Sequence, residues 1–273
     1  MKPKKRRGAA HITAAAVIVV AALALLAVFA FSQVLKVRSI VVVGNRTLLR
    51  EEVVTQSGVK PGDHLLGREV AAMEENLEKN RYIVYAGHEF DYKGTLTIRI
   101  IERMGRAVVN GFGLYYVTDE SGVILENSGM QYPLNVAGPE VSGFSFVNNA
   151  RFVVGEKLPV RDEMKLEKMS VVLDALDRTS MLSRTALVSV ELFDNLYIMT
   201  SEGTKIELGE ERLLPQKLLI AREVLSELEG TWNLKGTKID VSNGTEAHCI
   251  PPELPTPTPV PTATPTIAPA STP

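Results

Sequence analysis

Residues 14–31 read AAAVIVVAALALLAVFAF, eighteen apolar residues without a break. A helix of about 20 residues rises about 30 Å, which matches the hydrocarbon thickness of a bilayer. The run lies within residues 8–35, which contain no Asp, Glu, Lys or Arg, and five basic residues precede it. By the positive-inside rule, this pattern predicts a cytoplasmic basic tail at residues 1–9, a transmembrane helix at residues 10–35 and an external remainder.

The alternative for this segment is a cleaved signal peptide, because Val28-Phe29-Ala30 resembles a cleavage site. The apolar region of a signal peptide usually spans about 7–15 residues, and this run is longer. The length therefore favours an uncleaved membrane anchor.

The composition is that of a globular protein, with 45% hydrophobic and 23% charged residues, but the charges are unevenly distributed. Six of the 30 Lys and Arg lie in the first 36 residues, and Glu253 is the single acid after residue 250, so residues 37–250 are net acidic. Binding to phosphates needs clustered Lys and Arg, which argues against a nucleic-acid partner. The single cysteine, Cys249, excludes an intramolecular disulfide and fits a bacterial exterior protein stabilised by apolar cores.

Residues 37–102 show the patterns of a small α+β domain. The expected elements are a strand at residues 37–43, a helix at 47–57, a helix from Gly67, and strands at 83–92 and 95–102. Thr47 is expected to cap the first helix, and Gly58 to end it. The second helix places Val70, Met73 and Leu77 on one face. The predicted order is strand, helix, helix, strand, strand.

Three segments of this region resemble the POTRA domain of the FtsQ/DivIB family of bacterial cell-division proteins. They are VVGNRTLLREEV (42–53), SGVKPGDHLL (57–66) and TLTIRIIER (95–103), followed by Ala107. That family places a short basic tail and one membrane span directly before the POTRA domain. Lys93-Gly94 and Gly105 stand where the family usually has proline, and both are turn positions in which glycine can replace it. The resemblance implies a POTRA domain at residues 36–106.

Residues 107–250 predict a second α+β domain with a mixed or antiparallel sheet. The expected elements are a hairpin at 114–126, a helix at 161–178, strands at 186–192, 196–200 and 204–208, a helix from Leu213 or Leu214, and a hairpin at 237–250. Pro215 places the start of the last helix, because proline is tolerated only in a first turn. A strand ending in Leu208-Gly209 before a helix with Lys217-Leu218 is similar to the second external domain of the family. Residues 140–160 have poor periodicity and predict no element.

The register of the last hairpin follows from its alternation of polar and apolar residues. A three-residue loop, Asn243-Gly244-Thr245, pairs Ile239 with Cys249 and gathers the apolar residues on one face, whereas a two-residue loop mixes the faces. We therefore expect Gly244 in a left-handed conformation.

The family resemblance implies a non-enzymatic scaffold that regulates septum formation at the cell membrane of the division site. The implied partners are FtsL and small coiled-coil proteins of the FtsB/DivIC family, with a septal peptidoglycan synthase as a further candidate. In the family the last strands of the second domain form the docking edge. By this resemblance, the partner-binding residues of this chain would be Thr245, Glu246, Ala247, His248, Cys249 and Ile250. They would bind by β-strand addition, in which a partner segment pairs with unpaired backbone groups. The alternative is a strand that merely ends the sheet.

The last 23 residues, from Pro251, include nine prolines, and most of the others are Thr, Ala and Ser. Such a composition cannot bury a core. We expect a disordered tail at residues 251–273, extended and largely of polyproline type.

The sequence contains no pattern typical of catalysis or metal binding. The histidines, at positions 11, 64, 88 and 248, lack metal-ligand spacing with one another or with Cys249. Nucleophile-elbow and phosphate-loop motifs are absent. We therefore predict no catalytic residues, metal, cofactor or small-molecule substrate. The alternatives are a membrane-anchored wall-binding or wall-modifying enzyme, and a POTRA transporter component, which would usually carry tandem repeats or a β-barrel.

Overall fold

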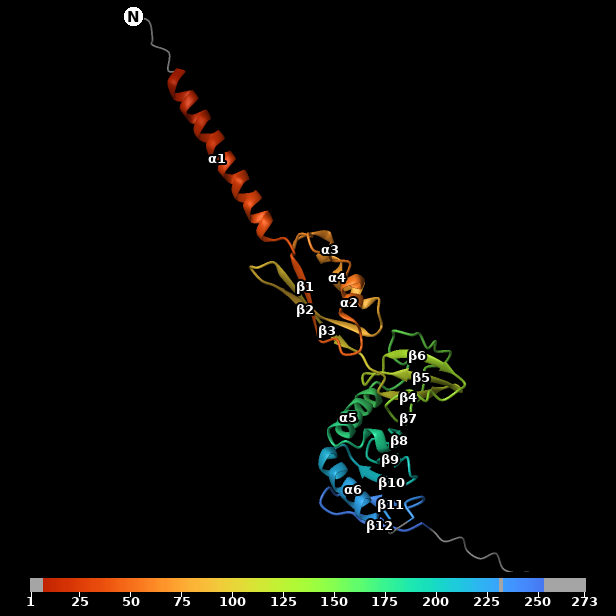
Figure 1. The fold of residues 1–273 in the computed structure, drawn as a ribbon. Helices are drawn as coiled ribbons and strands as arrows, with labels where there is room; N and C mark the ends of the chain where they lie inside the picture. The colour runs from red at the N-terminus through yellow and green to blue at the C-terminus, as the bar shows by residue number, and fades with distance from the viewer. Residues whose placement is uncertain (1–6, 231–232, 253–273) are drawn as a thin grey trace, which may run out of the picture. The chain divides into compact units, whose positions relative to one another are not determined.

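The computed structural model describes residues 7–230 and 233–252 and shows an α+β chain (Figure 1). The chain divides into two compact units. Unit 1 comprises Met1–Glu140 and Phe144–Ser170, and unit 2 comprises Val141–Gly143 and Val171–Pro273. The predicted boundaries of the POTRA and second domains stay predictions. Most of the predicted tail, residues 253–273, lies outside the described residues.

The first element is a long helix, α1 (Arg7–Val34), in the segment expected to be helical. Within the part of the chain that the structure describes, no helix was found to combine the length and the apolar character of a membrane span. The predicted transmembrane segment at residues 10–35 stays a prediction from the sequence.

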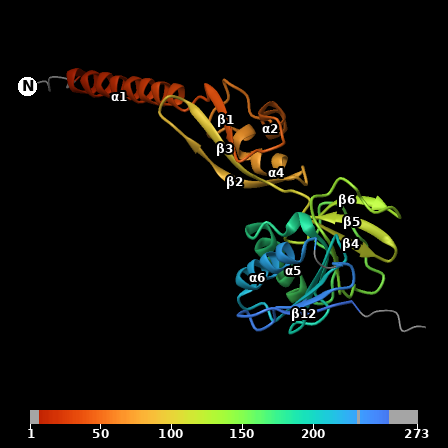
Figure 2. The ribbon, with the colours of Figure 1, turned by 60° about the horizontal axis from the view of Figure 1, so that its bottom comes forward.

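The POTRA region has the predicted order of elements, except that the single helix expected from Gly67 is divided into two short helices. Its elements are β1 (Ser39–Val43), α2 (Arg50–Ser57), α3 (Arg68–Ala71), α4 (Met73–Glu78), β2 (Ile83–Phe90) and β3 (Thr95–Glu102). The strands form a sheet in the order β1-β3-β2, with β1 parallel and β2 antiparallel to β3 (Figure 2). A parallel β1–β3 pair needs a long crossover, and the intervening helices and β2 supply it.

The core of this region lies between the helices and one face of the sheet. Its members are the buried apolar residues Val37, Ile40, Val53, Val59, Val70, Met73, Leu77, Ile83, Leu96, Ile98 and Ile100. The alternation of β3 and the helical spacing of Val70, Met73 and Leu77 therefore predicted the buried faces correctly. Burying each such side chain contributes about 1.5–3 kcal/mol.

The predicted helix cap at Thr47 is wrong, although the predicted end at Gly58 is confirmed. α2 begins at Arg50, its N-cap residue is Leu49, and no side chain caps it. The Thr47 hydroxyl instead donates a hydrogen bond to the Glu102 carboxylate. Gly58 ends the helix with φ 74°, which glycine adopts at little cost.

The second sheet is mixed and contains nine strands in the order β12-β11-β10-β9-β8-β7-β4-β5-β6. The strands are β4 (Ala107–Gly111), β5 (Leu114–Thr118), β6 (Ile124–Gly129), β7 (Glu140–Ser142), β8 (Thr185–Ser189), β9 (Leu196–Thr200), β10 (Lys205–Gly209), β11 (Lys238–Asp240) and β12 (His248–Ile250). The pairs β4–β7 and β10–β11 are parallel. The sequence patterns missed β4 and β7, because β4 is buried on both faces and β7 has only three residues.

Two longer helices accompany these strands, α5 (Met164–Arg178) and α6 (Leu214–Leu228), with a 3-10 turn at Leu182–Arg184. α6 begins where Pro215 predicted, after Leu213 in a left-handed conformation with φ 61°. α5 begins three residues later than predicted, because the Arg161 N–H donates to the Ser145 carbonyl at 2.8 Å and so belongs to the preceding loop.

Candidate functional site

The predicted docking edge lies at one end of the second sheet, where, among the described residues, β12 pairs with β11 alone. The two strands are antiparallel, and Ile239 lies opposite Cys249, which confirms the predicted register. The strand contains His248, Cys249 and Ile250, whereas Thr245, Glu246 and Ala247 lie before it, in and just after the turn. The edge is therefore half as long as the predicted range, and it ends at Pro251, which has no N–H to continue a ladder.

Backbone hydrogen bonds show which groups of β12 face away from the sheet. The Val241 N–H donates to the Glu207 carbonyl at 3.0 Å, and the Lys205 N–H donates to the Thr237 carbonyl at 3.0 Å. Alternate residues of β11 thus bond to β10, which leaves Lys238 and Asp240 to bond to β12. Their partners in the register are Ile250 and His248. It follows from the alternation of an antiparallel ladder that the N–H and C=O of Cys249 face the open edge.

The turn before β12 is stabilised by its own side chains and by α6. Gly244 has φ 75°, as predicted. The Asn243 side-chain oxygen accepts hydrogen bonds from the N–H groups of Thr245 at 3.0 Å and Glu246 at 3.1 Å. These bonds hold Thr245 and Glu246 in the turn, which explains why the strand starts later than predicted. The Gln216 amide of α6 donates to the Gly244 carbonyl at 2.8 Å.

Lys217 supports the same turn from within the core. Its ammonium donates to the carbonyls of Leu208 at 2.7 Å and Glu210 at 2.8 Å, and the residue is 3% exposed. Burial lowers the pKa of Lys217, while the nearby Glu210 charge opposes that shift. A Cβ at Gly244 would lie 3.7 Å from the Lys217 side chain, so the lysine stem packs directly beneath the turn. The sequence singled out Lys217 only through the family resemblance.

The side chains of the edge alternate as expected. Glu246, His248 and Ile250 are exposed, and Ala247 and Cys249 are half-buried. Burial, with the charge of Glu227, raises the pKa of the Cys249 thiol. A thiol of raised pKa is a weak nucleophile, so Cys249 serves as a small apolar residue rather than as a reactive group.

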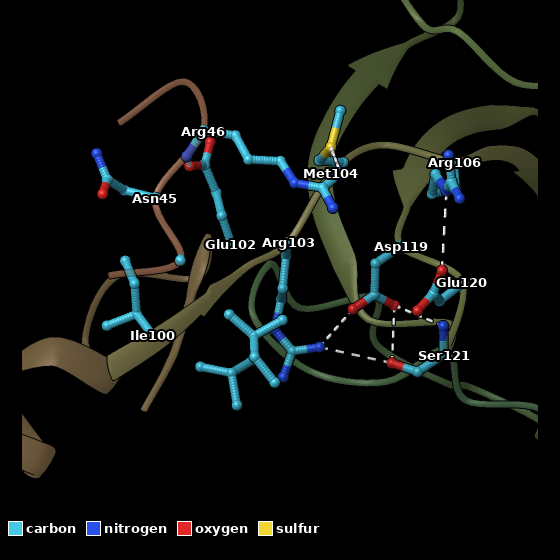
Figure 3. Close-up of a pocket in the computed structure, with 13 residues that line it drawn as sticks. Asn45, Arg46, Ile100, Glu102, Arg103, Met104, Arg106, Asp119, Glu120 and Ser121 are labelled. Carbon is cyan, nitrogen blue, oxygen red and sulfur yellow. Dashed lines mark hydrogen bonds and ion pairs between the residues drawn. The ribbon is translucent and has the colours of Figure 1, made fainter. Parts of the chain in front are cut away.

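A cleft of about 750 Å³ lies in unit 1, between the end of β3 and the β5–β6 turn (Figure 3). At one side of it, the Glu102 carboxylate accepts hydrogen bonds from the N–H groups of Arg46, Thr47 and Leu48 and from the Thr47 hydroxyl. Burial alone would raise the pKa of Glu102, but these hydrogen bonds outweigh it and leave the pKa below its ordinary value. Sequence reasoning missed this contact, since Glu102 and Thr47 are far apart in the chain.

At the other side of the cleft, Asp119 organises the β5–β6 turn. Its Oδ1 accepts hydrogen bonds from the Ser121 N–H at 2.9 Å, the Ser121 hydroxyl at 2.8 Å and the Val123 N–H at 2.8 Å. Its Oδ2 pairs with the Arg103 guanidinium, and Figure 3 shows that side chain reaching across from the end of β3. Glu120 lies 3.7 Å from Arg106. Each carboxylate of the cleft thus forms hydrogen bonds or ion pairs with groups of the same unit. These contacts give the carboxylates a structural role.

Within residues 7–230 and 233–252, no group of His, Cys, Asp and Glu side chains has the arrangement of a metal site. The strongest candidate site in the described chain is therefore the β12 edge, a surface of backbone groups.

Comparisons with known proteins agree with the POTRA region. The family model for the POTRA domain, FtsQ-type, matches residues 35–103. The cell division protein FtsQ of Geobacter sp. (strain M21) is 33% identical over 104 residues, which cover 37% of this chain and 38% of that protein. FtsQ of Anaeromyxobacter sp. (strain K) is 28% identical over 201 residues, 72% of this chain and 65% of that protein. Each match thus spans less than two thirds of the relative.

Among solved structures, the major extracytoplasmic domain of the trans isomer of the division protein DivIB from Geobacillus stearothermophilus matches with a TM-score of 0.32 and 16% identity. That alignment covers 48% of this chain and 97% of the solved chain.

Proposed function

Because this chain belongs to the FtsQ/DivIB family of bacterial cell-division proteins, we propose that it is a membrane-anchored, non-enzymatic scaffold of septum formation. It would act by holding other division proteins at the septum through its POTRA domain and its second domain. The match of the FtsQ-type POTRA model to residues 35–103 carries the division role.

The proposed anchor is the apolar segment at residues 10–35, with the basic residues 1–9 in the cytoplasm and residues 36–273 outside. The proposed external parts are the POTRA domain at residues 36–106, the second domain at residues 107–250 and the tail at residues 251–273. The apolar run and the preceding basic cluster support this topology.

We propose that FtsB/DivIC-type proteins dock on β12 by strand addition, with FtsL bound in the same complex. The open edge at Cys249 supports this, since a partner strand would complete its unpaired N–H and C=O. The exposed Glu246 and His248 side chains would then contact the partner and select it.

The test is substitution at Cys249 in the full chain, co-expressed with the FtsB/DivIC-type protein of the same organism. Cys249→Pro removes the outward N–H, and Cys249→Ala is the matched control that loses the thiol and keeps the N–H. We expect Cys249→Pro to weaken co-purification about tenfold or more, because main-chain bonds and the close approach of the partner strand are both lost. Cys249→Ala should bind within about twofold of the unchanged chain.

Circular dichroism and urea unfolding of both variants show whether the second domain remains folded. If Cys249→Pro folds and retains the partner, docking on β12 is wrong. The division role itself is tested separately, by locating a fluorescent fusion of the full chain. Uniform membrane fluorescence with no enrichment at the septum would contradict it.

A further inference from the structure

One end of the POTRA sheet, where β1 and β3 both begin, is built from three segments that lie apart in the sequence (Figure 2). The Val37 N–H donates to the Asp63 carbonyl at 2.8 Å. The Arg38 N–H donates to the Gly94 carbonyl, in the turn between β2 and β3, at 2.7 Å. These bonds join the segments into one surface. This surface is called here the basic end, and it consists of residues 36–38, 60–69 and 91–94.

The charge of the basic end differs in sign from that of the rest of the POTRA region. The basic end carries five Lys and Arg against three acids, whereas the rest of residues 36–103 carries six against seven. The Asp63 carboxylate accepts the Lys60 N–H at 2.7 Å, and the Asp91 carboxylate accepts the Lys93 N–H at 2.9 Å, so these two acids stabilise the local turns. The five basic residues are all exposed: Lys36, Arg38, Lys60, Arg68 and Lys93.

The basic end also exposes two large apolar or amphipathic side chains. Leu66 is 79% exposed and Tyr92 is 83% exposed. Leu65 packs against the POTRA core, whereas Leu66, the next residue, lies outside that core. The Lys93 ammonium lies 5.7 Å from the centroid of the Tyr92 ring. Exposed Leu and Tyr among Lys and Arg are typical of surfaces that lie in the headgroup layer of a membrane.

The basic end follows directly on the apolar N-terminal segment. The Leu65 N–H donates to the Leu35 carbonyl at 2.8 Å, and α1 extends to Val34. Three helical steps and two extended ones separate Phe31, the end of the apolar run, from Lys36, a span of at most about 12 Å. The headgroup layer is about 5–8 Å thick, and charges act over a Debye length of about 8 Å. The proposed anchor therefore keeps the basic end within range of the membrane surface charge.

We propose that the basic end lies on the membrane surface and binds anionic phospholipid headgroups, with Leu66 and Tyr92 inserted among them. This inference rests on the proposed membrane anchor. Exposed Lys and Arg form charge-assisted hydrogen bonds to phosphate, and each one near an anionic surface strengthens binding about fivefold. Because the anchor already holds the surface beside the bilayer, contacts that are weak singly suffice for docking. Docking would restrict the angle between the POTRA region and the membrane.

The test is fluorescence quenching of the full chain reconstituted in vesicles. Cys249→Ala removes the single native thiol, and Leu66→Cys is labelled with the fluorophore NBD. Vesicles of phosphatidylcholine alone are compared with an equimolar mixture of phosphatidylcholine and phosphatidylglycerol. Both contain lipid brominated on its acyl chains, which quenches a label that reaches into the bilayer. We expect the quenching at residue 66 to be at least threefold stronger in the anionic vesicles.

The same label at Leu49 is the matched control for position. Leu49 is 68% exposed and lies at the other end of the POTRA sheet, because the Leu48 N–H donates to the Glu102 carboxylate where β3 ends. We expect a label at residue 49 to be quenched at least fivefold less than one at residue 66 in anionic vesicles.

A pair of charge variants tests the basic residues. Lys60→Gln with Lys93→Gln removes two cations of the basic end and leaves those next to the anchor. We expect the ratio of docked to undocked chain to fall about tenfold or more. Lys79→Gln with Arg81→Gln removes the same charge where β2 begins, at the other end of the sheet, and should leave the quenching at residue 66 within about twofold of the parent.

Flotation of the vesicles separates the outcomes. A full chain that floats with neither lipid mixture contradicts the anchor and this inference with it. A chain that floats overturns the lipid docking alone, and leaves the anchor standing, in any of four cases. These are an unquenched label at residue 66, equal quenching at residue 49, equal quenching in both lipid mixtures, or full quenching in the variant of Lys60 and Lys93. A label at residue 66 that is shielded from aqueous iodide without bromine quenching would also overturn it, and would assign the surface to a protein contact.

Discussion

Glu102 shows how one side chain stabilises a turn that local sequence does not explain. Its carboxylate accepts the N–H groups of Arg46, Thr47 and Leu48, which precede α2. A carboxylate surrounded by such donors is stabilised in its charged form, and the pKa of Glu102 is accordingly lowered. Glu102, at the end of β3, thus accepts hydrogen bonds from the N–H groups before α2, whereas the sequence pattern had predicted a cap by Thr47.

Replacement of Glu102 by Gln tests this role. The variant keeps the size of the side chain and loses the charge, so the free energy of unfolding should fall by about 1–2 kcal/mol at pH 7. Because the folded pKa lies below the ordinary value of 4.5, this contribution is complete above pH 4.5 and is lost as the pH falls through the folded pKa. The difference between variant and parent in urea unfolding should therefore disappear in acid.

Glu78→Gln is the matched control, since Glu78 is exposed on α4. Its unfolding free energy should stay within about 0.5 kcal/mol of the parent. A Glu102→Gln deficit that persists unchanged at pH 2 would contradict the assigned role of the charge.

At the scale of elements, the β11–β12 hairpin depends both on its own sequence and on contacts with α6. Its loop and register follow from the alternation of residues 239–249 and from one glycine, whereas its position depends on Gln216 and Lys217 of α6. The turn before the edge strand is thus held in place by Gln216 and Lys217 of α6.

Gly244→Ala tests the turn. A Cβ there would meet side-chain atoms at ordinary contact distances of 3.5 Å or more, so the cost comes from φ 75° alone. We expect the free energy of unfolding to fall by about 1–2 kcal/mol. Gly244→Asn should cost less, because asparagine adopts the left-handed region more readily. Equal stability of the alanine variant and the parent in urea unfolding would show that the turn lacks this conformation.

At the scale of the whole molecule, the proposed topology places everything after residue 36 on one side of a membrane. Leu23→Arg puts a charge in the middle of the apolar run, which costs about 2.5–3.5 kcal/mol in insertion. The variant should shift from the membrane to the soluble fraction in carbonate extraction, with Leu66→Arg, an exposed position in the POTRA region, as the control. A reporter fused after Pro273 should be active only outside the cytoplasm, and activity inside would refute the orientation.

Sequence patterns predicted most of the regular elements because their signals are local. The spacing of Val70, Met73 and Leu77, the alternation in β3 and Pro215 in α6 each act within one or two turns of chain. The patterns failed at β4 and β7, where only the neighbouring strands identify a strand. They also failed at residues 140–160, where the aromatic side chains follow no regular spacing and Phe152 packs on Tyr116 of β5. For the candidate site, the register was predictable and the extent of the strand was not.

The sequence by itself determined the element order of the POTRA region, the register of the last hairpin and the family, since these depend on residue type and spacing along the chain. Only the tertiary structure decided that Glu102 holds the turn before α2, that Lys217 supports Gly244, that Cys249 turns its backbone to an open edge and that three separate segments form the basic end of the POTRA sheet. These contacts join residues far apart in the chain. Which residues meet in these contacts depends on the surfaces that the folded core brings together, and a local sequence pattern does not contain that information.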